Sequence, residues 1–164
     1  MKRNNNLFYG GTVRLERYGA GGAWTLRDNA FDSVALTNAN AAVVNDHNGY
    51  LGLGQAQLPG SAGGDQVLSS FTYTNLAVWP SWRFYQVSTD LVDKGSRNAT
   101  NAGLYHHTTR VDQAKETNST VDIGFHYVAV DTATGLPLDF DGDGLSDHSE
   151  DRDGDGQGVT DSGE

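Results

Sequence analysis

Acidic residues near the end of the chain have the spacing of a cation-binding loop. From Asp139 the sequence reads Asp-Phe-Asp-Gly-Asp-Gly-Leu-Ser-Asp-His-Ser-Glu. When Asp139 is position 1, carboxylates stand at positions 1, 3, 5, 9 and 12, and Gly144 stands at position 6. This is the ligand spacing of a Ca²⁺ loop. The predicted ligands are five carboxylates and one backbone carbonyl, from Asp139, Asp141, Asp143, Leu145 (carbonyl), Asp147 and Glu150.

Oxygen ligands at this spacing suit a hard divalent cation. Alternating carboxylates on a tightly curled backbone point toward one centre, and Gly144 permits the sharp turn. Without a cation, carboxylates held this close together would repel one another strongly. Mg²⁺ fits less well, because it requires a smaller octahedral shell and keeps more of its water. The sequence therefore predicts Ca²⁺ as the cofactor.

A second acidic cluster follows directly and contains Asp151, Asp153, Asp155 and Asp161. Counted from Asp151, the first three acids take positions 1, 3 and 5, but position 9 is then Val159. Counted from Asp153, Asp161 takes position 9 and a glutamine takes position 5. The register stays open, so the sequence predicts one ion in the first loop and leaves a second or further ion open. The flanking helices of a true EF-hand are missing.

The net charge of −10 lies entirely in this tail. Residues 131–164 contain eleven acids and only Arg152 as a base, whereas the acids and bases of residues 1–130 balance. A polyanionic surface repels phosphate backbones and anionic lipids, which argues against nucleic acid as a partner. No apolar run approaches the roughly 18 residues of a membrane span, so membrane insertion is not expected. The alternative for the tail is a disordered acidic segment.

The rest of the chain has the pattern of short strands. Apolar residues alternate with a period of two in several places, and clusters of Gly and Asn separate these runs. An Asn-x-aromatic pattern recurs at Asn6, Asn29 and Asn48, at separations of 23 and 19 residues. Stacked turns, or rungs, of a parallel β-helix have about this length, and an Asn at each corner can take the left-handed bend and form a ladder. We expect an all-β fold containing a short parallel β-helix, or β-solenoid; a β-sandwich is the alternative.

The elements that would position the acidic loops fall into three consecutive regions. Residues 1–75 are expected to form the solenoid rungs, residues 76–130 a capping or flanking β region, and residues 131–164 the acidic calcium-binding tail. The alternation over residues 121–128 is the clearest strand pattern in the chain, with His126 expected to pair with Asp122 on one face.

Two resemblances to known families support this division. The tail resembles the thrombospondin type 3-like and dockerin-like calcium repeats of secreted bacterial proteins, through Asp-x-Asp-x-Asp-Gly-Leu-x-Asp over residues 139–147. Segments 5–11, 24–32 and 84–96 resemble rungs and a closing segment of right-handed parallel β-helix proteins, and 103–112 and 118–130 resemble the piece that joins such helices to calcium repeats. The resemblance implies the C-terminal region of a secreted protein with an extracellular or cell-surface location.

No set of residues has the spacing of a catalytic site. The five histidines lack the i, i+4 pairing of a helical zinc site, and no serine lies in a nucleophile elbow. Arg27, Asp28 and Asp32 could form an acid–base patch on a β-helix face, although exposed ion pairs are more common. Aromatic residues suited to stacking on sugars are Trp24, Trp79, Trp82, Tyr85 and Tyr105. We predict a non-enzymatic protein; the alternative is a carbohydrate-binding or carbohydrate-active β-helix fragment with a polysaccharide ligand.

A short solenoid leaves open strand edges at both ends. Unpaired N–H and C=O groups at such edges favour pairing with another chain. Head-to-tail pairing of this kind builds a filament rather than a closed oligomer. The expected partners are therefore copies of the same chain, joined by strand pairing and by docking of the calcium-bound tail. A third hypothesis is a dockerin-like tail that binds a separate receptor.

Overall fold

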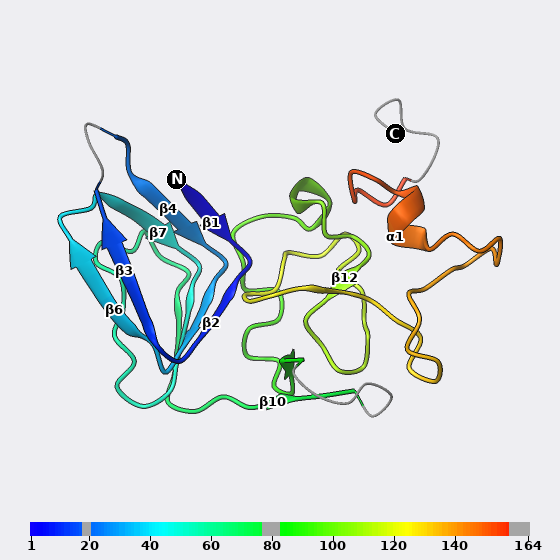
Figure 1. Cartoon of the computed structure of the whole chain (residues 1–164), viewed down its shortest axis with the longest axis horizontal. Coiled ribbons are helices and arrows are strands. Elements are labelled where there is room, and N and C mark those ends of the chain that lie inside the picture. The colour runs from blue at the N-terminus through cyan, green and yellow to red at the C-terminus, as the bar shows by residue number, and fades with distance from the viewer. Residues whose placement is uncertain (18–20, 77–82, 158–164) are drawn as a thin grey trace. The chain divides into compact units, whose positions relative to one another are not determined.

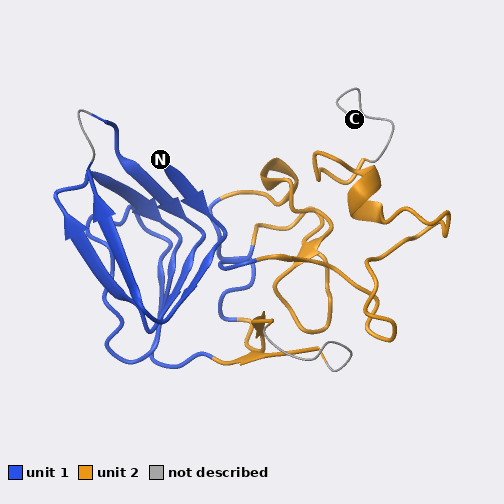
Figure 2. Cartoon of the chain, viewed as in Figure 1, with its two compact units in different colours: residues 1–71, 90–96, 122–125 blue, residues 72–89, 97–121, 126–164 orange. Residues whose placement is uncertain are grey.

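The computed structural model describes residues 1–17, 21–76 and 83–157 (Figure 1). Its elements are short strands, apart from a 3₁₀ turn at Thr100–Ala102 and the one-turn helix α1 (Asp147–Glu150). The expected all-β class is confirmed. The chain divides into two compact units that are not consecutive in sequence (Figure 2). Unit 1 comprises residues 1–71, 90–96 and 122–125, and unit 2 comprises residues 72–89, 97–121 and 126–164.

Unit 1 contains three parallel sheets, each built from strands that recur along the chain. The first sheet has the order β1 (Lys2–Asn4), β4 (Trp24–Arg27), β7 (Val43–Asp46). The second has the order β2 (Leu7–Tyr9), β5 (Ala30–Asp32), β8 (Gly49–Leu51), β9 (Gln66–Leu68). The third pairs β3 (Thr12–Glu16) with β6 (Ala35–Ala39). We call the successive layers rung 1 (residues 1–16), rung 2 (24–39), rung 3 (43–51) and rung 4 (61–68).

Left-handed residues lie at a recurring corner of the four layers. Asn5, Asp28 and His47 have φ values of 53°, 58° and 52°, and Gly64 continues the series at 73°. The first three immediately precede the Asn-x-aromatic position of their rung, and Gly64 precedes Asp65. The sequence-based expectation that the recurring asparagine itself takes the bend is therefore wrong.

The recurring asparagines form a continuous ladder through the interior of unit 1. Asn6 Nδ2 donates to Asn29 Oδ1 at 2.9 Å, and Asn29 Nδ2 donates to Asn48 Oδ1 at 3.2 Å. The backbone N–H of each asparagine donates to the same acceptor, and the Asn48 N–H donates to Asp65 Oδ1 at 2.8 Å. Asn29 and Asn48 are fully buried. Buried amides must be hydrogen-bonded to be tolerated, and this ladder satisfies them.

The aromatic residue of each rung stacks on its neighbours beside the ladder. Phe8 and Phe31 are nearly parallel with ring centroids 5.0 Å apart, and Phe31 and Tyr50 are 5.5 Å apart. Leucines from the neighbouring strands, among them Leu15 and Leu26, complete this core. Because the pattern places polar and apolar side chains at fixed positions of each rung, the ladder and the ring stack together set the register of the parallel pairing.

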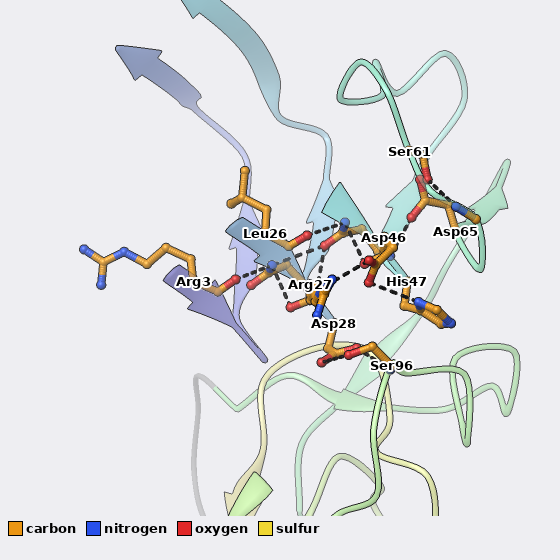
Figure 3. A network of polar contacts seen from close by, with 12 residues as sticks. Arg3, Leu26, Arg27, Asp28, Asp46, His47, Ser61, Asp65 and Ser96 are labelled. Atoms are coloured by element: carbon orange, nitrogen blue, oxygen red, sulfur yellow. Dashed lines mark hydrogen bonds and ion pairs between the residues drawn. The ribbon is translucent and has the colours of Figure 1, made fainter. Parts of the chain in front are cut away.

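Two later segments pack against the corners of these rungs in unit 1. The Asp28 carboxylate is fully buried and accepts hydrogen bonds from the Ser96 N–H at 2.6 Å and from the Ser96 hydroxyl at 2.9 Å (Figure 3). Leu91 and Ile123 lie against Gly49, where a Cβ would come within 3.2 Å of Leu91. Gly49 therefore allows this close approach.

The strand predicted over residues 121–128 is wrong apart from its last two residues. Only Tyr127–Val128 (β13) is a strand, and residues 121–124 are all buried rather than alternating. The Ile123 N–H donates to Leu91 O and the Gly124 N–H donates to Asp28 O, so neighbouring residues use different acceptors. Regular strand pairing requires the N–H groups of one strand to bond to a single neighbouring strand, whereas these two acceptors lie in different segments. The positive φ of Gly124, 127°, also interrupts an extended course.

Unit 2 is held by short antiparallel pairs and irregular loops. β10 (Tyr73–Thr74) pairs with β11 (Tyr85–Gln86), and β12 (His107–Thr108) pairs with β13. Its apolar cluster contains Leu76, Tyr85 and Val130. The buried His126 ring lies 2.7 Å from Glu116 Oε1, and the expected pairing of His126 with Asp122 stays a prediction.

Candidate metal centre

The first acidic loop brings three carboxylates together. Oxygen atoms of Asp139, Asp141 and Asp143 all lie within 4.8 Å of one another, so this triplet could hold a metal ion. Asp139 organises the loop, because its two oxygens accept the N–H groups of Gly142 at 2.8 Å and Gly144 at 3.1 Å. Both glycines have positive φ, 74° and 100°, which a residue with a side chain rarely adopts. The curled backbone expected from the sequence is present.

The second loop repeats this arrangement twelve residues later. Asp151 accepts the N–H groups of Gly154 and Gly156, at 2.9 and 2.6 Å, as Asp139 does in the first loop. Asp151, Asp153 and Asp155 likewise have oxygens within 4.8 Å of one another. The two registers left open by the sequence are therefore distinguished: the structural repeat begins at Asp151. Asp161 lies outside the described residues.

The second loop differs from the first because it packs against the body of unit 2. Asp151 is buried, and its Oδ2 lies 2.8 Å from His106 Nε2, whereas Asp139 is exposed. The Tyr105 N–H donates to the Gly154 carbonyl at 3.0 Å. A Cβ on Gly154 would overlap the Gly103 carbonyl, and one on Gly156 would overlap the Tyr105 ring. Glycine at these positions thus serves both the loop turn and the docking of the loop.

Hydrogen bonds hold the Asp151 carboxylate in its charged form. Burial acts to raise its pKa, but the N–H groups of Gly156 and Asp155, the nearby His106 and the Gly154 N–H together lower it below the usual 3.8. Donors that stabilise a carboxylate have this effect. Asp151 is consequently an anion at neutral pH, as a metal ligand must be.

Glu150 lies near the first triplet. Desolvation raises its pKa above 4.5, and the negative charges of Asp141, Asp143, Asp139 and Asp147 raise it further. Like charges close together disfavour ionisation of a carboxyl group, so these neighbours shift the Glu150 pKa in the same direction as desolvation. Glu150 ends helix α1, so the chain returns after Asp143 to bring a further carboxylate toward the same loop.

Two other predicted ligands are placed differently. Asp147 is not among the carboxylates that converge in either described triplet. Its Oδ1 accepts the Phe140 N–H at 2.8 Å, and its Oδ2 lies 3.4 Å from Lys115 Nζ. Asp147 therefore links the first loop to Lys115 in the body of unit 2. The Leu145 N–H donates to Asp143 Oδ1 at 2.8 Å, and the role of the Leu145 carbonyl as a ligand stays a prediction.

The sequence did not reveal the residues that anchor the tail. Lys115 and His106 contact Asp147 or Asp151 from segments more than thirty residues earlier in the chain. The segment that contains these residues, 103–115, also contains Gly103 and Tyr105, which contact the second loop. Nothing in their spacing connects them to the acidic loops.

The residues considered for an acid–base patch serve structural contacts. Arg27 Nε lies 3.0 Å from Asp46 Oδ2, and the Asp28 carboxylate is occupied by Ser96 (Figure 3). Asp32 accepts the hydroxyl hydrogen bond of Ser33 at 3.0 Å. These three side chains do not face one another as a set.

The aromatic residues considered for sugar stacking are also engaged. Tyr85 is fully buried, and Trp24 Nε1 donates to the Glu16 carbonyl at 3.0 Å. Tyr105 lies beside the second acidic loop. Trp79 and Trp82 lie outside the described residues.

His107 should make stability depend on pH. Desolvation, followed by repulsion from His126, His148 and His106, lowers the pKa of His107 from 6.5 to about 4. Between these values the unfolded chain binds a proton that the folded chain does not, so stability falls as the pH falls from 6.5 toward 4. Urea unfolding measured across this window should give an unfolding free energy that falls as the pH falls. In the His107→Gln variant the slope of this free energy with pH should be smaller, by an amount that corresponds to up to about one bound proton. An unchanged slope in the variant would contradict this assignment.

Comparison with protein-family models, curated proteins and solved structures finds no match to this chain. Within residues 1–17, 21–76 and 83–157, no helix has the length and apolar character needed to cross a membrane. Two Asp triplets, twelve residues apart and built by the same hydrogen bonds, are the strongest candidate for a binding site in this protein.

Proposed function

We propose that this protein is a non-enzymatic, extracellular structural module whose acidic tail binds Ca²⁺. One observation carries the proposal: two successive loops use the same set of N–H donors and glycine turns to aim three carboxylates at a common point. Ca²⁺ accepts six to eight oxygen ligands in flexible geometry, which suits such loops with added carbonyl and water ligands. Mg²⁺ demands a tighter octahedron. Asp139, Asp141, Asp143 and Glu150 would hold the first ion, and Asp151, Asp153 and Asp155 a second.

The proposed architecture of unit 1 is a short β-solenoid. Three parallel sheets, left-handed residues at recurring corners, an asparagine ladder and a ring stack support it. Solenoids of this kind need each rung to cover the next, because a single rung cannot bury its apolar side. The combination of rungs and calcium loops agrees with the resemblance to secreted β-helix proteins carrying thrombospondin type 3-like repeats.

A structural role is favoured over an enzymatic one by the use of the polar side chains. The acid–base candidates are engaged in contacts that hold the rungs, and Asp28 is inaccessible. An extracellular location is supported by the exposed first loop, because weak Ca²⁺ sites fill at the millimolar concentrations found outside cells. The partners we propose are copies of the same chain, joined by strand pairing and by the calcium-bound tail.

Calorimetric titration of the full chain tests the calcium proposal. Wild-type protein should bind Ca²⁺, and Asp143→Ala should weaken the first site at least about tenfold, since a ligand is lost from a small oxygen shell. Asp131→Ala is the matched control, because it removes one tail carboxylate that only caps a local turn. Undetectable Ca²⁺ binding, or equal losses in the two variants, would refute the proposal.

A further inference from the structure

The four-stranded sheet of unit 1 has β2 at one edge and β9 at the other. Its order is β2-β5-β8-β9, so β2 of rung 1 and β9 of rung 4 each have one strand neighbour among the described residues. Both edge strands carry accessible side chains: Tyr9 of β2 is 60% exposed, and Val67 of β9 is 57% exposed. An open edge of a parallel sheet is a template for one more strand.

The backbone groups at the two edges are complementary in register. In a parallel pair, alternate residues direct both backbone groups to one neighbour. The Ala30 N–H donates to Asn6 O, so the Asn6 carbonyl points toward β5. The backbone N–H and C=O of Leu7, the next residue, therefore point outward. At the other end, the Gln66 N–H donates to Asn48 O, which leaves the Val67 groups facing outward. A strand like β9 placed beside β2 would continue the pattern, with Val67 opposite Phe8.

The side chains at the two edges are complementary as well. Within the ladder, each rung donates to the Oδ1 of the next asparagine, and among the described residues no donor reaches Asn6 Oδ1. Asp65 occupies the ladder position of rung 4, and Val67 occupies the ring position. The Asp65 backbone N–H would be placed to donate to Asn6 Oδ1, and the exposed Val67 would cover Phe8.

Charge favours the same arrangement. Rung 1 begins with Lys2 and Arg3 and has no acid before Glu16. Rung 4 contains Asp65 and no base. Opposite charges on two surfaces speed their encounter and disfavour contact between like ends. Two first-rung ends would repel, whereas a first-rung end attracts a fourth-rung end.

We propose that unit 1 self-associates head to tail, with β9 of one copy adding in parallel to β2 of a second copy. Asp65 then stands opposite Asn6, and Val67 stacks on Phe8. The contact is heterologous, so it propagates into a filament. This inference deepens the self-association part of the proposed function and does not depend on the calcium sites.

At this junction Asp65 would supply only one of the two hydrogen-bond donors that an asparagine supplies in the ladder. Asn6 and Asn29 each donate both the backbone N–H and the Nδ2 group to the next rung, whereas the Asp65 side chain has no amide hydrogens to donate. Asp65→Asn would supply the missing donor while its Oδ1 still accepts the Asn48 N–H. One added hydrogen bond should strengthen association about fivefold.

Sedimentation velocity of the full chain over a concentration series tests the inference. Wild-type protein should associate, Asp65→Asn should associate about fivefold more tightly, and Val67→Lys should lose association. Val44→Lys is the matched control, because Val44 is 45% exposed on β7, which belongs to another sheet. Circular dichroism melts establish that each variant is folded.

The outcomes distinguish this inference from the calcium proposal. Monomeric wild-type and Asp65→Asn protein at all concentrations, or equal effects of the Val67 and Val44 variants, would overturn head-to-tail stacking. Association that EDTA abolishes but that ignores both Asp65→Asn and Val67→Lys would assign the contact to the tail and also overturn it. Ca²⁺ titration remains interpretable in each case, because its ligands lie in the other unit.

Discussion

Asn29→Ala should destabilise the protein by about 3–4 kcal/mol. Asn29 is fully buried, and its amide donates to Arg3 O, Arg27 O and Asn48 Oδ1 while its oxygen accepts from Asn6. Truncation would leave these buried groups without partners, and each unsatisfied group costs roughly 1–3 kcal/mol before relaxation. Urea unfolding monitored by circular dichroism measures the loss.

Asn6→Ala provides the control at the open end of the same ladder. Asn6 is only partly buried and donates to Asn29 Oδ1 and to Asn4 O. Water can replace its bonds, so the loss should stay near about 1 kcal/mol. Measured at micromolar concentration, equal losses for Asn6→Ala and Asn29→Ala would show that the ladder does not support the rungs.

Asp151→Ala should release the second acidic loop from unit 2 and cost about 2–3 kcal/mol. The Asp151 carboxylate accepts three N–H groups of its own loop and contacts His106. Removing it leaves the Gly154 turn unsupported, and the contact between Gly154 O and the Tyr105 N–H should open. Hydrogen exchange at the Tyr105 amide reports this opening directly.

Asp139→Ala is the matched variant, since Asp139 holds the first loop through the equivalent bonds but is exposed. It should weaken Ca²⁺ binding while leaving exchange at Tyr105 close to that of the wild type. Faster exchange in both variants would mean that the two loops fold as one element. Unchanged exchange in both would mean that His106 and the Gly154 contact do not anchor the tail.

Local spacing predicted several features of the candidate site well. The curl of residues 139–144 follows from acids at alternate positions and glycines at the turns, because the hydrogen bonds that Asp139 and Asp141 accept in it join residues at most five apart. The Asn-x-aromatic repeat likewise located the ladder and the ring stack at Asn6, Asn29 and Asn48. Such patterns are readable because each rung presents the same groups at the same position.

Other features could not be read from spacing. The register of the second loop was ambiguous, since two counts of its acids satisfied the ligand pattern nearly equally. The hydrogen bonds from the N–H groups of Gly154 and Gly156 to Asp151 decide it, because they match the bonds that Asp139 accepts in the first loop. The left-handed corners fell on the residue before each ladder asparagine, and the spacing of the asparagines does not distinguish these two positions.

The all-β class, the acidic loops and the recurring ladder positions were readable from the residues alone, since these features depend on residues close together in the chain or repeated at a steady interval. Three features became known from the folded chain: Ser96 donates to the buried Asp28 carboxylate, His126 contacts Glu116, and residues 121–124 form no strand. These contacts join segments far apart in the chain. Their partners depend on the path of the intervening loops, and no local pattern records that path.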